Sequence, residues 1–176
     1  MEMQKGVLHM EERKRVYIDM DGVLAEYRPD ATDEDYVSAG YYLGLAPRPA
    51  MVDAVRFLID SDIADVFVLS SVIAGIESAA VAEKNAWLDL YLPQIDRSHR
   101  VFPLCGTSKA DAVGGIGKTD VLCDDYSHNL ENWRLAGGTA VKILNECNGK
   151  KGSFKAGPRV EISGREQLAR LIEKIA

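Results

Sequence analysis

Short apolar runs alternate along the chain with segments in which apolar positions recur every three or four residues. The short runs predict buried strands at residues 15–19, 66–69, 100–104, 120–123 and 140–144. The periodic segments predict helices at residues 49–60, 78–92 and 129–136, and a last helix after a capping box at Ser163 and Glu166. Continuously apolar strands that alternate with helices indicate a parallel sheet covered on both faces. The expected fold class is therefore α/β, with a Rossmann-like parallel sheet.

Length and composition are those of one ordinary globular domain. The chain has 176 residues, of which 47% are hydrophobic and 27% are charged, which is enough for a full-sized core. We expect a charged leader at residues 1–14 and one core domain at residues 15–176. The core carries a short, irregular, acidic insertion after its first strand, at about residues 25–48.

Charge and cysteine content limit the partners and the compartment. The net charge of −6 argues against binding to a nucleic-acid polymer, which requires a basic face. The dispersed cysteines Cys105, Cys123 and Cys147 are typical of reduced thiols in the cytoplasm rather than of a disulfide framework. The first 14 residues lack the apolar core of a signal peptide, and no apolar run approaches the ~18 residues of a membrane span. We therefore expect a cytoplasmic protein without membrane contact, with Cys123 buried in its strand.

The most informative motif is Asp19-Met20-Asp21-Gly22, which directly follows the first predicted strand. Alternate residues of a strand point the same way, so Asp19 and Asp21 can converge just beyond the strand end. Two carboxylates placed together are costly unless a cation or a shared proton lies between them. The pattern suits chemistry in which one carboxylate attacks and the other moves a proton.

Polar residues also follow other predicted strands. Ser70 and Ser71 follow the second strand, Asp124 and Asp125 follow the fourth, and Lys109 lies in a loop after the third. Taken alone, the serines could form a turn, the acid pair could cap a helix and the lysine could be an ordinary surface residue. In open α/β sheets, however, the functional crevice lies beyond the carboxyl ends of the strands. The common edge therefore favours a single site.

Together these side chains indicate phosphoryl transfer. Asp19 would attack phosphorus to form an aspartyl-phosphate, and Asp21 would protonate the leaving alkoxide and later deprotonate the attacking water. The acid pair after the fourth strand, with Asp19, offers the hard oxygen ligands that suit Mg²⁺. The serine pair and Lys109 would bind the phosphoryl oxygens as substrate-binding groups.

In this order the residues resemble the motifs of haloacid-dehalogenase-like phosphatases, namely Asp19–Gly22, Ser70, Lys109, and Asp124-Asp125 with Asn129. Within that superfamily, residues 19–25 and the acid pair are most similar to the 5'(3')-deoxyribonucleotidases. The resemblance covers the chain from Val16 to about Leu144 and implies the Rossmann-like core.

The same resemblance implies a metal site and leaves one lysine open. It implies Mg²⁺ held by Asp19, by the backbone carbonyl of Asp21 and by the acid pair, with Asp125 as the preferred direct ligand over Asp124. Lys109 is the preferred phosphate-binding lysine, but Lys118 also lies near the fourth motif.

Two segments bear on the substrate. Nucleotidases of the resembled family carry a helical cap between the first strand and the next core helix, and the insertion here is too short for one. Its tyrosines could stack on a ring or simply pack the segment: Tyr27, Tyr36, Tyr41 and Tyr42. A basic stretch at residues 148–159 could be a flap over an anionic substrate or a solvated hairpin, and its cations are Lys150, Lys151, Lys155 and Arg159.

We therefore expect a Mg²⁺-dependent phosphohydrolase that cleaves a small phosphomonoester, with a (deoxy)nucleoside monophosphate as the leading substrate, as in a 5'-nucleotidase. One alternative is a phosphatase for another small metabolite such as a sugar phosphate. Another is a non-catalytic module that binds a nucleotide or a partner, although a binding module needs no nucleophile. Dehalogenation is disfavoured because a halide leaving group does not need the proton that Asp21 would supply. Fold alone does not decide among these reactions.

Overall fold

The structure is a computed structural model that describes residues 13–147 and 154–175. Most of the expected leader, residues 1–12, lies outside the described residues, and so do Lys150 and Lys151 of the basic stretch. Of the remaining cations of that stretch, Lys155 is exposed, and Arg159 donates to the backbone carbonyl of Phe154 at 2.7 Å.

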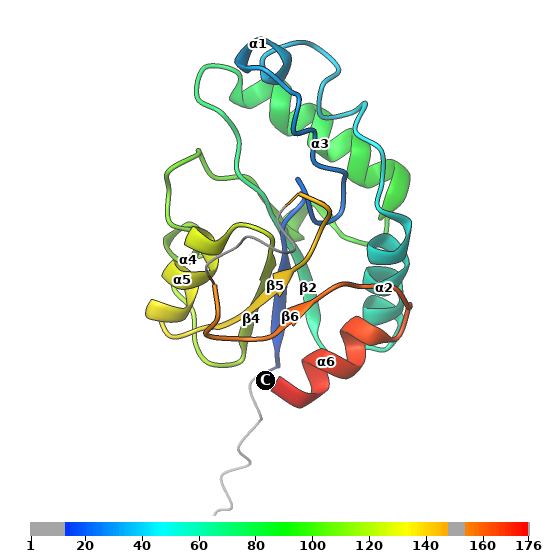
Figure 1. Ribbon diagram of the computed structural model, residues 1–176, viewed down its shortest axis with the longest axis vertical. Coiled ribbons are helices and arrows are strands. Elements are labelled where there is room, and N and C mark those ends of the chain that lie inside the picture. Colours follow the sequence, from blue (N-terminus) through cyan, green and yellow to red (C-terminus); the bar gives the residue numbers. More distant parts are fainter. Residues whose placement is uncertain (1–12, 148–153, 176) are drawn as a thin grey trace, which may run out of the picture.

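One six-stranded parallel sheet, in the order β3-β2-β1-β4-β5-β6, organises the fold (Figure 1). Its strands are β1 (Arg15–Ile18), β2 (Asp65–Leu69), β3 (Arg100–Val101), β4 (Asp120–Asp124), β5 (Thr139–Ile143) and β6 (Arg159–Val160). The first five correspond to the predicted strands, and β6 was not predicted. The prediction for β3 ran too far: Pro103 has no N–H for the sheet, and its carbonyl accepts from the N–H of Val72 at 2.8 Å. The expected α/β Rossmann-like class is confirmed.

Helices cover both faces of this sheet (Figure 1). One face packs against α2 (Pro49–Asp60), α3 (Glu77–Tyr91) and α6 (Gln167–Ile175), and the other packs against α4 (Lys109–Ala112) and α5 (Ser127–Leu135). The expected insertion contains only one helical turn, α1 (Asp33–Tyr36), and η1 (Arg97–His99) is a single 3₁₀ turn before β3. Pro49 stands at the first position of α2, as predicted, because its fixed φ suits a helix start.

The predicted capping box of the last helix is wrong, because Ser163 pairs with Gln167 and not with Glu166. The backbone N–H of Ser163 donates to Oε1 of Gln167 at 3.0 Å, and its hydroxyl lies 3.5 Å from the same oxygen. Glu166 instead pairs with Arg170, one turn farther along. The helix accordingly begins at Gln167, one residue after the predicted acid.

Alternation along the strands divides the core into two layers. Val16 and Ile18 of β1 point into the larger layer, under α2, α3 and α6, whereas Tyr17 points into the smaller layer with α5. Cys123 is fully buried in the larger layer, as expected. Among the described residues, none of the helices combines the length and the apolar content needed to cross a membrane.

The packing of α5 gives a matched test of this arrangement. Leu130 is fully buried in the smaller layer, whereas Leu135 on the same helix is 72% exposed. Leu130→Ala should lower the free energy of unfolding by about 2–5 kcal/mol, because it removes buried methyl groups and leaves a cavity. Leu135→Ala should change it by less than about 0.5 kcal/mol. Urea denaturation of the two variants measures the difference, and equal losses would contradict the assigned faces of α5.

Candidate active site

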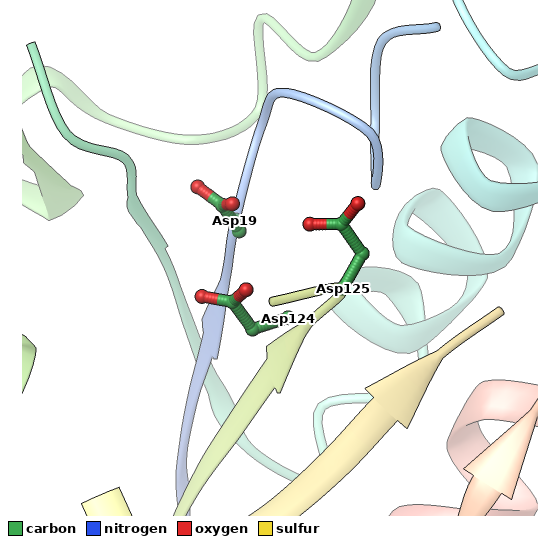
Figure 2. Close-up of side chains that lie close together, drawn as sticks. All are labelled: Asp19, Asp124 and Asp125. Atoms are coloured by element: carbon green, nitrogen blue, oxygen red, sulfur yellow. The ribbon is translucent and has the colours of Figure 1, made fainter. Parts of the chain in front are cut away.

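The carboxyl ends of β1 and β4 place three acids around one point. Parallel pairing aligns Ile18 with Cys123, and the N–H of Asp19 donates to the carbonyl of Cys123 at 2.9 Å. Asp19 therefore lies beside Asp124, the last residue of β4, and Asp125 follows. Figure 2 shows the three carboxylates gathered at the ends of the two strands. One oxygen from each lies within 4.8 Å of the others.

The turn after β1 is tight and requires Gly22. The carbonyl of Met20 accepts from the N–H groups of Leu24 and Ala25, each at 2.9 Å. Gly22 has φ of +79°, in the left-handed region that side chains disfavour. A Cβ atom there would also lie 2.4 Å from Oδ2 of Asp125. The glycine thus lets the turn pass directly beside the acid cluster.

Lys109, at the start of α4, bridges two of the acids. Its Nζ lies 3.1 Å from Oδ1 of Asp19 and 2.6 Å from Oδ2 of Asp124, and the residue is only 4% exposed. Burial alone would lower the pKa of Lys109, but the charges of Asp124 and Asp19 and their hydrogen bonds outweigh burial and raise it. Lys118 is exposed, and its carbonyl accepts from the hydroxyl of Thr139. The structure therefore brings Lys109, and not Lys118, to the acids.

The two acids after β4 have different surroundings. Asp124 is fully buried and also accepts from the N–H of Tyr126 at 2.7 Å and from Nδ2 of Asn129 at 2.9 Å. Asp125 accepts from Nδ2 of Asn145 at 2.8 Å. Burial, with the charges of Asp19 and Asp124, raises the pKa of Asp125 to about 7. A divalent cation among these oxygens would relieve that repulsion, so the donor set fits Mg²⁺.

Asp21 points to a different group of side chains. Its carboxylate lies outside the cluster of Asp19, Asp124 and Asp125. Oδ2 of Asp21 instead accepts from Nζ of Lys84 at 2.5 Å and from the hydroxyl of Ser70 at 3.4 Å. Oδ1 is the one buried side-chain nitrogen or oxygen atom in the described part of the chain that has no hydrogen-bond partner. The two aspartates of the motif thus have separate environments, although both line one cavity.

That cavity has a volume of about 180 Å³ and lies between the sheet edge and the insertion. The sheet edge contributes both motif aspartates, Ser71 and Lys109, whereas Ser70 is fully buried behind the wall. All four tyrosines of the insertion line it. Three of them also pack edge to face, Tyr36 on Tyr41 and Tyr41 on Tyr42, with ring centroids 5.0 Å apart. Tyr27 is 47% exposed, so it is the tyrosine best placed to meet a ligand at the mouth.

Sequence reasoning missed several residues of this region, Lys142 of β5 among them. Lys84 follows Val81 by three positions and precedes Leu88 by four, so a lysine in the apolar stripe of the predicted helix was its signal. Asn145 follows β5 at the same sheet edge as the residues that were found. Arg48 donates to the carbonyls of Gly22, Val23 and Leu144 at 2.9–3.1 Å, and nothing in its local sequence marks that role.

Comparisons with known proteins give a fold and no close relative. No family model and no curated protein matches the sequence. D,D-heptose 1,7-bisphosphate phosphatases from B. bronchiseptica, complexed with magnesium and phosphate, and from Burkholderia thailandensis superpose with TM-scores of 0.61 and 0.62. Their identities are 14% and 15%, and the alignments cover 92% of this chain and 99% or 100% of theirs. An L-2-haloacid dehalogenase from Xanthobacter autotrophicus, with chloropropionic acid covalently bound, has a TM-score of 0.54 at 11% identity, covering 94% of this chain and 100% of its own.

The chain thus has the fold of the haloacid-dehalogenase-like phosphatases. The same fold is found in a phosphatase and in a dehalogenase, so the choice between these reactions rests on the residues of the site.

Metal binding at the acid cluster should depend on pH. A carboxyl group must lose its proton to bind a metal, and Asp125 in the metal-free protein has a pKa of about 7. Lowering the pH from 8 to 6 protonates this group, so the Kd for Mg²⁺ should rise by about tenfold. Calorimetric titration at pH 6, 7 and 8 measures the change. Asp125→Asn should bind Mg²⁺ more weakly without this dependence, and a wild-type Kd that is constant over the range would contradict the assignment.

Proposed function

We propose that this protein is a Mg²⁺-dependent phosphohydrolase that cleaves a small phosphomonoester through an aspartyl-phosphate. The observation that carries the proposal is the cluster of Asp19, Asp124 and Asp125 bridged by Lys109, with Asp21 on the same cavity wall. The order of the motifs and the fold shared with haloacid-dehalogenase-like phosphatases support it. The environment of Asp21 argues against a dehalogenase, which has no need of a proton donor.

Three carboxylates and one carbonyl would hold the metal. Asp19, Asp124, Asp125 and the backbone carbonyl of Asp21 are the proposed ligands, all oxygen donors as Mg²⁺ prefers. When bound, Mg²⁺ would neutralise the acids and withdraw charge from the phosphoryl oxygens. Lys142 holds the acid pair in place, because its Nζ donates to the backbone carbonyl of Asp125 at 2.7 Å.

The charge at the edge fits a phosphate dianion. Four carboxylates, from Asp19, Asp21 and the acid pair, face three buried ammonium groups, which are those of Lys84, Lys109 and Lys142. With Asp21 protonated for its role as acid and the other groups ionised, the site has no net charge, and a divalent cation gives it two net positive charges. The dianion of a phosphomonoester is then attracted, whereas the metal-free site would give no net attraction.

The two aspartates of the turn would perform the two chemical steps. Lys109 engages Oδ1 of Asp19, so Oδ2 would attack phosphorus while the bond to the leaving oxygen breaks. Asp21 gives its proton to that oxygen and releases the alcohol. Asp21 then takes a proton from a water molecule, whose oxygen displaces Asp19 from phosphorus. The products are the alcohol and inorganic phosphate, and both aspartates return to their starting states.

Replacing the two aspartates should give different losses. Asp19→Asn should lower kcat/KM by at least about a thousandfold on every substrate, including p-nitrophenyl phosphate, because it removes the nucleophile. Asp21→Asn should lower kcat/KM most for alkyl phosphates, because their leaving groups need a proton. Asp60→Asn is a matched control, since Asp60 is exposed and belongs to another Asp-x-Asp pair. Wild-type turnover by Asp19→Asn would overturn the mechanism.

The leading substrate class is the nucleoside monophosphates, as in a 5'-nucleotidase. The support is the tyrosine-rich wall of the cavity and the similarity of the motif turn to the deoxyribonucleotidases. The volume of about 180 Å³ lies below the ~300 Å³ of typical small-molecule pockets, so the phosphate and the sugar would fill it and the base would lie at the mouth against Tyr27. The same small volume favours a sugar phosphate as the second candidate.

A base held only at the mouth of the cavity should be bound with little discrimination between different bases. Selective recognition of a base requires buried polar partners, whereas stacking contributes about 1–3 kcal/mol regardless of the base. We therefore expect kcat/KM values within about tenfold of one another for thymidine, deoxyguanosine and deoxycytidine monophosphates. Ribose 5-phosphate, which has no base, should be cleaved less efficiently. Equal efficiency on ribose 5-phosphate would instead favour the sugar-phosphate reading.

The compartment follows from the thiols. Cys105 and Cys147 are free and exposed, and Cys123 is free and buried. Unpaired exposed thiols suit the reducing cytoplasm, which we propose as the location of this enzyme.

A further inference from the structure

Lys84 is a charged residue in the middle of α3 whose side chain is completely buried. Its Nζ lies 2.5 Å from Oδ2 of Asp21, 2.9 Å from the hydroxyl oxygen of Ser70 and 3.0 Å from the backbone carbonyl of Ser71. A buried ammonium group is costly unless its hydrogen bonds are satisfied. This lysine therefore lies where it does because three acceptors at the ends of β1 and β2 surround it.

These contacts exclude a direct role for Lys84 in binding phosphate. An ammonium group has three N–H donors, and the three acceptors occupy all of them. The ring of Tyr42 covers the group as well, with Nζ 4.8 Å from its centroid. Lys109 differs in this respect, because it lines the cavity and its contacts in the described structure use two donors. Lys84 can act on the reaction only through Asp21 and the serines.

The contact defines the orientation of the Asp21 carboxylate. Lys84 and Ser70 both engage Oδ2, and Oδ1 has no hydrogen-bond partner among the described residues. A protonated carboxyl oxygen is a donor, so a proton on Oδ2 would oppose the two hydrogen bonds that this oxygen accepts from Lys84 and Ser70. The pair of donors on Oδ2 therefore assigns the exchangeable proton to the opposite oxygen.

We propose that Lys84 is a positioning residue that holds Asp21 in the orientation from which it protonates the leaving group. This inference rests on the proposed function, in which Asp21 is the general acid. It adds a residue on α3, outside the four motifs, that the protonation step depends on. A displacement of the Asp21 carboxylate by about 1 Å would slow proton transfer to the leaving group without affecting attack by Asp19.

The neighbouring residue links the same helix to the cavity wall. The carboxylate of Glu83 accepts from the backbone N–H of Gly40 at 2.6 Å and from that of Tyr42 at 3.0 Å. Consecutive residues of α3 thus hold the insertion and the catalytic acid. Because Tyr42 also packs over Lys84, the position of Asp21 is tied to the wall that meets the substrate.

The dependence of activity on the leaving group tests this role. We compare kcat/KM, which reports the steps up to departure of the leaving group, for p-nitrophenyl phosphate and for a nucleoside monophosphate. Lys84→Met should lower kcat/KM about a hundredfold for the alkyl phosphate and less than about threefold for the aryl phosphate. Asp21→Asn supplies the reference pattern, and Lys118→Met removes an exposed lysine as the matched control. Retained Mg²⁺ binding and a cooperative melting transition like that of the wild type show that each variant is folded.

A double variant extends the test to the case in which Lys84→Met alone does not fold. Removing both partners of a buried pair is tolerated better than removing one. If Lys84 acts through Asp21, D21N/K84M should show the same leaving-group dependence as Asp21→Asn alone, since the two losses share one cause. A further loss on the alkyl phosphate in the double variant would overturn the inference. So would an equal loss on both substrates in Lys84→Met.

The outcome also separates this inference from the proposed function. If Asp21→Asn shows the leaving-group dependence and Lys84→Met does not, only the role of Lys84 is wrong. If the wild type cleaves neither substrate, or if Asp21→Asn shows no such dependence, the proposed function is wrong as well.

Discussion

Mutual repulsion among four carboxylates at one edge of a parallel sheet is the constraint on which this structure depends. Asp19 and Asp21 follow β1, and Asp124 and Asp125 end β4 or follow it. Three nearly buried lysines meet them from different elements: Lys84 from α3, Lys109 from α4 and Lys142 from β5. Each lysine needs the acceptors at the edge to offset its own burial. The lysines of α3 and α4 therefore attach these helices to the sheet at the same place where the acids need positive charge.

This arrangement explains why the polar residues lie where the sheet ends. Four of the strands, β1, β2, β4 and β5, have apolar positions buried on both faces, so most charged side chains lie toward the strand ends. At the carboxyl edge, the backbone also leaves the sheet and can turn, as it does at Gly22. Arg48 and Asn145 hold that turn, because both donate to the carbonyl of Gly22. The acids are thus fixed by backbone contacts as well as by charge.

Much of the fold and of the grouping of the candidate site residues followed from the sequence, because both depend on the order of short segments along the chain. The apolar runs gave five strands, and the residues after three of them gave the aspartates and serines. The same reasoning was not applied to the fifth strand. Asn145 follows β5 at the same edge and contacts Asp125. The boundary of β3 and the first residue of α6 were misplaced, because Pro103 and Gln167 decide them through contacts outside their own pattern.

Other features could not be predicted because they are purely tertiary. Lys84 lies 63 residues after Asp21, and only the packing of α3 over the sheet edge brings them together. A lysine in an apolar stripe signals a buried partner but does not identify it. The choice between Lys109 and Lys118 was of the same kind, because the sequence predicted glycine-containing loops of similar composition around both. In the structure, Lys109 begins the short helix α4 and contacts Asp19 and Asp124.

The sheet edge and the insertion control different properties of this site. The proposed reaction rests on the acids and lysines of the edge, which the strands and helices of the core hold. The proposed substrate preference rests on residues 25–48, and these are fixed to the core at several points. Trp87 donates to the carbonyl of Leu45 at 2.8 Å, and Glu83 binds the backbone at residues 40 and 42. The cavity wall formed by the insertion is therefore preformed, and under the proposed function its selectivity would come from the shape and side chains of that wall.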